Sequence, residues 1–188
     1  MSLQAIPHLI TLFRLACAPA ITWLLCYSRF RAALILLLLA GVSDWFDGFA
    51  ARRLHSAGNA GVILDPLADK VLLVTLFIVL GLLGLIPLWM LALAVARDLV
   101  IVIGALLVRL LRGVRKFLPS LLGKVSTFFQ ITLVLMALLY AAFPFPAFLY
   151  LKYAALCLSA FFTLVSGIDY IRRGILFARR PLAGRTVA

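Results

Sequence analysis

Glutamate is absent from the sequence, and aspartate supplies all six acidic residues among 188. Cysteine and histidine are also scarce, with three and two residues respectively. Cys17, Cys26 and Cys157 have no paired spacing and stand in apolar segments, which argues against a disulfide framework or a zinc site. We expect them to be small buried residues. Long polar segments are missing too, so the sequence offers no separate soluble domain.

Apolar residues dominate what is present. They make up 66% of the chain, and the mean hydropathy is +1.20, whereas a soluble domain is roughly half apolar. The formal net charge is +12, which often indicates nucleic-acid binding. Here the basic residues lie between apolar runs, so anionic lipids and membrane orientation explain them better, and we expect no nucleic-acid partner.

Six apolar runs follow one another, and each is long enough to cross a hydrocarbon layer about 30 Å thick. They predict an all-α, polytopic membrane protein with six transmembrane helices, at residues 3–27, 32–54, 60–83, 88–111, 119–143 and 147–172. We expect residues 1–175 to form one membrane domain and residues 176–188 to form a basic C-terminal tail. The first run lacks the features of a cleaved signal peptide, so a retained helix is expected.

The distribution of basic residues predicts the orientation. They gather after the second, fourth and sixth runs, and the connections after the third and fifth runs are almost uncharged. The first connection, with Arg29 and Arg31, is a mild exception. By the positive-inside rule both termini are cytoplasmic. The compact length and the lack of a targeting segment favour a bacterial inner membrane.

Four of the six carboxylates stand within residues 44–69, between strongly apolar flanks: Asp44, Asp47, Asp65 and Asp69. Residues three or four apart share a helix face, so each segment presents its two carboxylates on one side. A short turn joins the segments and should make them antiparallel neighbours. The charge pattern places all four carboxylates at the cytoplasmic side of the membrane.

Such a cluster calls for a cation, because four carboxylates in a small volume repel one another strongly at low dielectric. One or two divalent ions would neutralise them, and oxygen-only ligands favour Mg²⁺, Mn²⁺ or Ca²⁺. Arg52 can contact a phosphate beside the metal. Small residues on the same faces let a ligand approach the backbone closely: Gly48, Ala51 and Gly61. The set suits the phosphates of an activated, nucleotide-linked lipid.

Other interpretations of this stretch exist. The small residues could serve only the packing of membrane helices, and a single aspartate could cap a helix or pair with Arg52 or Lys70. A cation transporter is the alternative of a different class, since acids within a membrane also mark ion pathways. It accounts for the carboxylates but leaves Gly48, Arg52 and Gly61 without a role.

The stretch reads Asp44-x2-Asp47-Gly48-x2-Ala51-Arg52-x8-Gly61-x3-Asp65-x3-Asp69. It resembles the signature of the CDP-alcohol phosphotransferase family, with every fixed position filled. The six-span layout agrees, and Ile6-Pro7 with Leu9, Thr11 and Arg14 is similar to the family's opening segment. His8 departs from the Asn that often follows this proline, which weakens the expectation of a cytidine contact there.

The resemblance implies an enzyme that cleaves a CDP-linked lipid such as CDP-diacylglycerol, releases CMP and joins the phosphatidyl group to an alcohol. It implies that the four aspartates hold two divalent cations, Mg²⁺ or Mn²⁺. Asp69 would also be the general base that activates the acceptor hydroxyl. Residues Gly48, Ala51, Arg52 and Gly61 would line the CMP and diphosphate site. The resemblance further implies a homodimer whose active site faces the cytoplasm.

The acceptor is expected to depend on residues outside this signature. Phosphatidylglycerophosphate synthases often have Arg-Glu where Arg97-Asp98 stands here, and a second Lys at the position of Ser126. The sequence therefore resembles eukaryotic-type cardiolipin synthases more, which implies phosphatidylglycerol as the acceptor, with glycerol 3-phosphate as the alternative. The candidate acceptor-binding residues are Arg97, Arg109 and Lys124.

Each of these basic residues has a simpler interpretation. Arg109 and Lys124 could serve membrane orientation alone. Arg97 and Asp98 could form a mutually satisfied pair within the bundle. Asp169 lies one turn before Arg172 and Arg173, so a salt bridge near the end of the last helix is its expected role.

Overall fold

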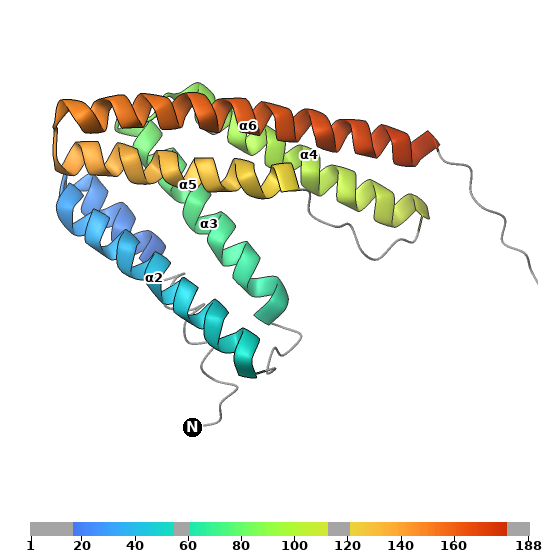
Figure 1. The fold of residues 1–188 in the computed structure, drawn as a ribbon, viewed down its shortest axis with the longest axis horizontal. Coiled ribbons are helices and arrows are strands. Elements are labelled where there is room, and N and C mark those ends of the chain that lie inside the picture. Colours follow the sequence, from blue (N-terminus) through green and yellow to red (C-terminus); the bar gives the residue numbers. More distant parts are fainter. Residues whose placement is uncertain (1–16, 55–60, 113–120, 180–188) are drawn as a thin grey trace, which may run out of the picture. The chain divides into compact units, whose positions relative to one another are not determined.

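The computed structural model describes the backbone of residues 17–54, 61–112 and 121–179, and side chains within these ranges except at 44–54, 61–69, 105–112 and 177–179. Residues 17–26 are helical. Five longer helices follow, as Figure 1 shows: α2 (Phe30–Leu54), α3 (Gly61–Leu82), α4 (Leu88–Arg112), α5 (Leu121–Ala142) and α6 (Pro146–Arg179). No strand occurs in these ranges, which confirms the all-α prediction.

The start of each helix from α2 to α6 lies within two residues of its expected position. The end of the last helix was predicted wrongly, because α6 continues to Arg179 instead of stopping near Arg172. Asp169 and Arg173 form an ion pair of 2.8 Å on this helix, four residues apart. A helix can continue past the end of its apolar run, because ion pairs between residues four apart stabilise the helical backbone there.

Two of the described helices have the length and apolar character to cross a membrane: Leu121–Ala142 and Pro146–Leu176. In its apolar part, before Asp169, α6 turns apolar side chains outward, with Phe161, Leu164 and Ile168 all more than half exposed. Exposed apolar surface of this extent requires an apolar partner such as lipid. Membrane association therefore has structural support, and the six-span topology with cytoplasmic termini stays a prediction.

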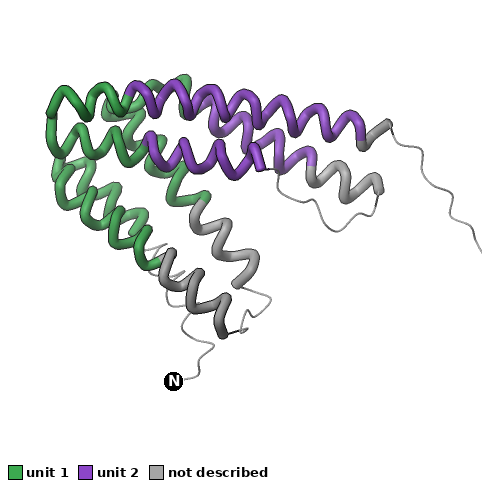
Figure 2. The backbone as a smooth tube through the Cα atoms, viewed as in Figure 1, with its two compact units in different colours: residues 1–91, 134–152 green, residues 92–133, 153–188 purple. Residues whose placement is uncertain are grey.

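The chain divides into two compact units, shown in Figure 2. Unit 1 contains residues 1–91 and 134–152, and unit 2 contains residues 92–133 and 153–188. The core of unit 1 is aliphatic, with Ile21, Leu25, Leu80 and Met90 fully buried. In unit 2 the fully buried residues are partly polar: Ser126, Gln130, Ser159, Thr163 and Ser166.

The turn between α3 and α4 depends on glycine. Gly84 has a φ of 71°, in the left-handed region that ends many helices. The backbone N–H of Leu85 donates to the carbonyl of Leu80 over 2.9 Å, and that of Gly84 donates to Gly81. Gly81 also leaves room for Leu88, whose Cδ2 would lie 3.0 Å from an added Cβ. The chain therefore reverses direction tightly after α3.

Candidate functional site

The residues of the predicted acidic site lie on two helices of unit 1. Those of the first segment fall within α2: Asp44, Asp47, Gly48, Ala51 and Arg52. Those of the second fall within α3, which begins at Gly61 and includes Asp65 and Asp69. The helical backbone on which the shared-face argument depends is thus confirmed. The side chains of this set lie outside those that the structure describes, so their convergence stays a prediction.

The helix lengths give the carboxylates a matching register. Asp44 stands 14 residues after the start of α2 at Phe30, and Asp69 stands 13 residues before the end of α3 at Leu82. At 1.5 Å per residue both lie about 20 Å along their helices. Asp47 and Asp65 each lie about 26 Å along by the same measure. Two antiparallel helices with level ends would therefore place the aspartates in two pairs of equal depth.

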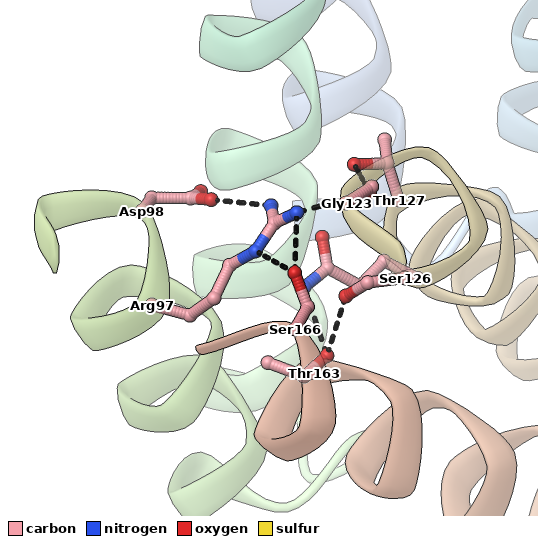
Figure 3. A network of polar contacts seen from close by, with 8 residues as sticks. Arg97, Asp98, Gly123, Ser126, Thr127, Thr163 and Ser166 are labelled. Carbon is pink, nitrogen blue, oxygen red and sulfur yellow. Dashed lines mark hydrogen bonds and ion pairs between the residues drawn. The ribbon is translucent and has the colours of Figure 1, made fainter. Parts of the chain in front are cut away.

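A second polar cluster is fully described and belongs to unit 2. Its centre is Arg97 on α4, whose side chain is only 5% exposed. Figure 3 shows the guanidinium surrounded by three helices. Nη1 donates to Oδ1 of Asp98 over 2.8 Å, and Nη2 donates to the carbonyl oxygen of Gly123 over 2.9 Å. Nε and Nη2 both donate to Oγ of Ser166, over 3.3 and 3.2 Å.

Hydroxyl groups continue this cluster between α5 and α6. Oγ of Ser126 and Oγ1 of Thr163 lie 3.1 Å apart and share a hydrogen bond (Figure 3). Nε2 of Gln130 donates to the same Thr163 oxygen over 3.2 Å. All three residues are at most 1% exposed. In an apolar environment such contacts hold helices together because the polar groups lack water as an alternative partner.

The geometry therefore bears out the pairing of Arg97 with Asp98. It also joins that pair to the hydroxyl of Ser166, which was not among the predicted site residues. Ser159, Thr163 and Ser166 recur at intervals of four and three residues, which is the spacing of one helix face. That periodicity was visible in the sequence and marks the buried polar side of α6.

The other singled-out residues have simpler surroundings. Lys124 follows the buried Gly123 on α5 and is exposed, and Arg109 lies on α4 outside the described side chains. The ion pair of Asp169 with Arg173 confirms the expected salt bridge. The three cysteines are free, but only Cys17 is buried, so the expectation of burial was wrong for Cys26 and Cys157. A small apolar residue on a lipid-facing helix need not be covered by protein.

Comparison with known proteins places these features in a family. The sequence profile described as CDP-alcohol phosphatidyltransferase matches residues 4–165. A CDP-diacylglycerol–glycerol-3-phosphate 3-phosphatidyltransferase of Bacillus subtilis is 36% identical over 149 residues, covering 76% of this chain and 72% of that protein. The CMP-forming cardiolipin synthase of Rattus norvegicus is 32% identical over 185 residues, covering 90% of this chain and 61% of its own length.

A putative cardiolipin synthase of Mycobacterium tuberculosis is 33% identical over 124 residues, which is 65% of this chain and 59% of that protein. The chain thus spans about three fifths of the length of these two cardiolipin synthases. The names of these relatives give glycerol 3-phosphate as an acceptor in one case and cardiolipin as a product in the others, so similarity alone does not choose between the two reactions.

Proposed function

The chain belongs to the CDP-alcohol phosphatidyltransferase family, and we propose that it transfers a phosphatidyl group from CDP-diacylglycerol to a glycerol-type acceptor with release of CMP. The observation that carries this proposal is the complete acidic signature on α2 and α3. If the ends of α2 and α3 are level, its aspartates fall in two pairs of equal axial depth, an arrangement that suits a shared pair of cations.

The donor set fits divalent cations. Asp44, Asp47, Asp65 and Asp69 offer only oxygen, the ligand that Mg²⁺ and Mn²⁺ prefer. Two such ions would supply electrostatic stabilisation of the diphosphate charge. The residues Gly48, Ala51 and Gly61 would let the diphosphate approach the helix backbones, and Arg52 would donate hydrogen bonds to a phosphate oxygen.

Asp69 has the second role in this proposal. Its carboxylate would accept the proton of the acceptor hydroxyl as that oxygen forms a bond to the lipid-side phosphorus. The bond from this phosphorus to the oxygen of CMP breaks, and CMP leaves with the electron pair. Atoms and charge balance without any further reactant.

For the acceptor we propose phosphatidylglycerol, with glycerol 3-phosphate as the alternative that the Bacillus relative supports. A phosphomonoester acceptor needs a cation to hold its charge. The guanidinium of Arg97 is engaged with Asp98, Gly123 and Ser166, which argues against its use for that purpose. Lys124 and Arg109 remain candidates for contact with the acceptor headgroup.

The surroundings of the enzyme are part of the proposal. We infer six membrane spans, cytoplasmic termini and an active site that faces the cytoplasm, because basic residues follow the even-numbered runs. A bacterial inner membrane and a homodimeric state are proposed as well.

The test supplies purified protein and CDP-diacylglycerol with each acceptor in turn, with Mg²⁺, Mn²⁺ or a chelator. We expect metal-dependent CMP release and cardiolipin as the lipid product, identified by mass spectrometry. Asp69→Asn should abolish turnover, whereas the matched Asp169→Asn, at a partly exposed ion pair outside the acidic signature, should retain it. Cation flux across vesicles without CMP release from any acceptor would instead support the transporter.

A further inference from the structure

Exposed aromatic side chains gather at three connections of unit 1. Trp23 and Tyr27 lie at the end of the helical stretch 17–26, and their ring centroids are 4.9 Å apart. Trp89 lies at the start of α4, and Phe145 and Tyr150 lie at the start of α6. Their exposed fractions range from 54% for Trp89 to 75% for Tyr150. These rings therefore face the surroundings and not the core of the unit.

The connections share one end of unit 1 (Figure 2). Arg31, in the first turn of α2, joins the first and third of them directly. Its Nε donates to the carbonyl oxygen of Ala142, the last residue of α5, over 3.3 Å. Its guanidinium carbon also lies 5.0 Å from the ring centroid of Phe143. A cation at a helix C-terminus is favourable because it satisfies a terminal carbonyl and the helix dipole.

This end of unit 1 carries positive charge, and no aspartate lies close in sequence to its three connections. None of the six aspartates lies in residues 17–43, 70–97 or 121–168. The cations at these connections are Arg29 and Arg31, which are exposed, and Lys152, which is partly buried. Nζ of Lys152 lies 5.0 Å from the ring centroid of Tyr140, so two of the three cations contact aromatic faces. Among the described contacts neither Arg29 nor Arg31 forms an ion pair with a carboxylate, so anions of the surroundings can approach both.

We propose that this end of unit 1 forms a collar that binds the headgroups of anionic phospholipids at the membrane interface. The collar consists of Trp23, Tyr27, Arg29, Arg31, Trp89, Phe145, Tyr150 and Lys152. Tryptophan and tyrosine favour headgroup depth because their rings have an apolar body and a polar edge. Arginine matches phosphate oxygens with its planar donors. Among the described contacts only Nε of Arg31 donates a hydrogen bond, which leaves its two Nη groups for a phosphate.

The collar is separate from the proposed reaction site. Asp44 and Asp69 lie about 20 Å along α2 and α3 from this end, so a headgroup bound at the collar cannot be the one that reacts there. The collar also accounts for Arg29 and Arg31, which are the exception in the distribution of basic residues along the chain. Arg31 caps the C-terminus of α5, and the collar would hold both Arg29 and Arg31 near lipid phosphate.

The test uses the fluorescence of Trp23 and Trp89 in the full chain, with Trp45→Phe removing the third tryptophan. The protein is reconstituted in phosphatidylcholine vesicles that contain increasing fractions of brominated phosphatidylserine or brominated phosphatidylcholine. Phosphatidylserine is chosen because it is anionic and is neither substrate nor product of the proposed reaction. Quenching against lipid fraction gives the binding constant of one lipid relative to the other.

We expect phosphatidylserine to be preferred, and bromine near the headgroup to quench more than bromine deep in the acyl chain. Arg29→Gln should lower the preference by up to about fivefold, since one basic residue near an anionic surface contributes about 1 kcal/mol. Arg31→Gln should lower the preference for phosphatidylserine further, and lysine at positions 29 and 31 should restore much of it. Arg172 is exposed and lies outside the collar, so Arg172→Gln should leave the preference unchanged.

Equal constants for the two lipids in the parent chain would overturn the proposal. The same holds if the preference survives Arg29→Gln and Arg31→Gln together, or if deep bromine quenches more strongly. Arg29 is exposed and its side chain has no role in the fold that the described contacts show, so this variant decides the question even if loss of the Arg31 cap impairs folding.

Discussion

Replacement of Arg97 by methionine tests whether the buried cluster of unit 2 holds α4, α5 and α6 together. Methionine keeps most of the apolar stem and removes the guanidinium. The change eliminates the contacts to Asp98, Gly123 and Ser166 at 2.8 to 3.3 Å. Gly123 belongs to α5 and Ser166 to α6, so one substitution removes the attachments of α4 to two other helices at once.

The contacts themselves set the expected size of the effect. Removing one member of a buried ion pair costs about 3–5 kcal/mol of the free energy of unfolding. The carbonyl of Gly123 keeps the hydroxyl of Thr127, which donates to it over 3.1 Å, and the side chain of Asp98 is 15% exposed. Both facts favour the lower limit, so we expect a loss of about 3 kcal/mol. Lysine at the same position should lose less, because it keeps the charge but not the planar fork.

The free energy of unfolding is measured by titrating sodium dodecyl sulfate into mixed micelles and following tryptophan fluorescence. Arg173→Met is the matched control, since it removes an arginine from a pair with Asp169 in which the arginine side chain is 52% exposed. Exposed pairs contribute less than about 1 kcal/mol. The reasoning fails if the free energy of unfolding of Arg97→Met lies within about 1 kcal/mol of the parent value, or if Arg173→Met lowers it as much as Arg97→Met does.

Two further changes test local features by the same unfolding measurement. Thr163→Val keeps the side-chain volume but removes both hydrogen bonds to α5, so it should lower the free energy of unfolding by about 1–2 kcal/mol. The control is Thr132→Val, whose hydroxyl bonds only within its own helix and which should lower it far less. Equal losses would contradict the role of the buried cluster. Gly84→Ala should lower the free energy of unfolding by about 1 kcal/mol, because alanine disfavours the left-handed φ of 71°. Gly41→Ala, with open space around its Cβ position within α2, should raise it by up to about 1 kcal/mol. An increase in stability for Gly84→Ala would refute the strain argument.

The helices could be predicted from the sequence because each consists of an apolar run bounded by turn residues. The start of α3 at Gly61 and its end before Gly84 follow from glycines that interrupt the apolar pattern. The end of α6 could not be found in this way. The hydropathy pattern indicates where the apolar run stops, whereas the ion pair of Asp169 and Arg173 stabilises the helix through the charged segment that follows.

The acidic segments could be placed on helices from spacing alone, and the structure adds the bounds of α2 and α3, from which the depth of each aspartate along its own helix follows. The polar cluster of unit 2 could be predicted only in part. The sequence suggested the pair of Arg97 and Asp98, since the two are neighbours. It could not supply the partners on other helices, Gly123 and Ser166, because their distance in sequence from Arg97 is large and their approach depends on how three helices pack.

Ser126 connects this packing to the question of the acceptor. The resemblance used its lack of charge as a sign of phosphatidylglycerol as acceptor, since related glycerophosphate enzymes often have lysine there. In this chain Ser126 is 0% exposed and shares a hydrogen bond with Thr163, within the same buried cluster as the Arg97 guanidinium (Figure 3). A lysine would add a second cation to a cluster in which Asp98 is the only acid among the described side chains. Burying an uncompensated charge costs several kcal/mol, so Ser126→Lys should destabilise the fold and should not produce phosphatidylglycerophosphate. A Ser126→Lys protein that unfolds like the parent and accepts glycerol 3-phosphate would show that this position faces the acceptor instead.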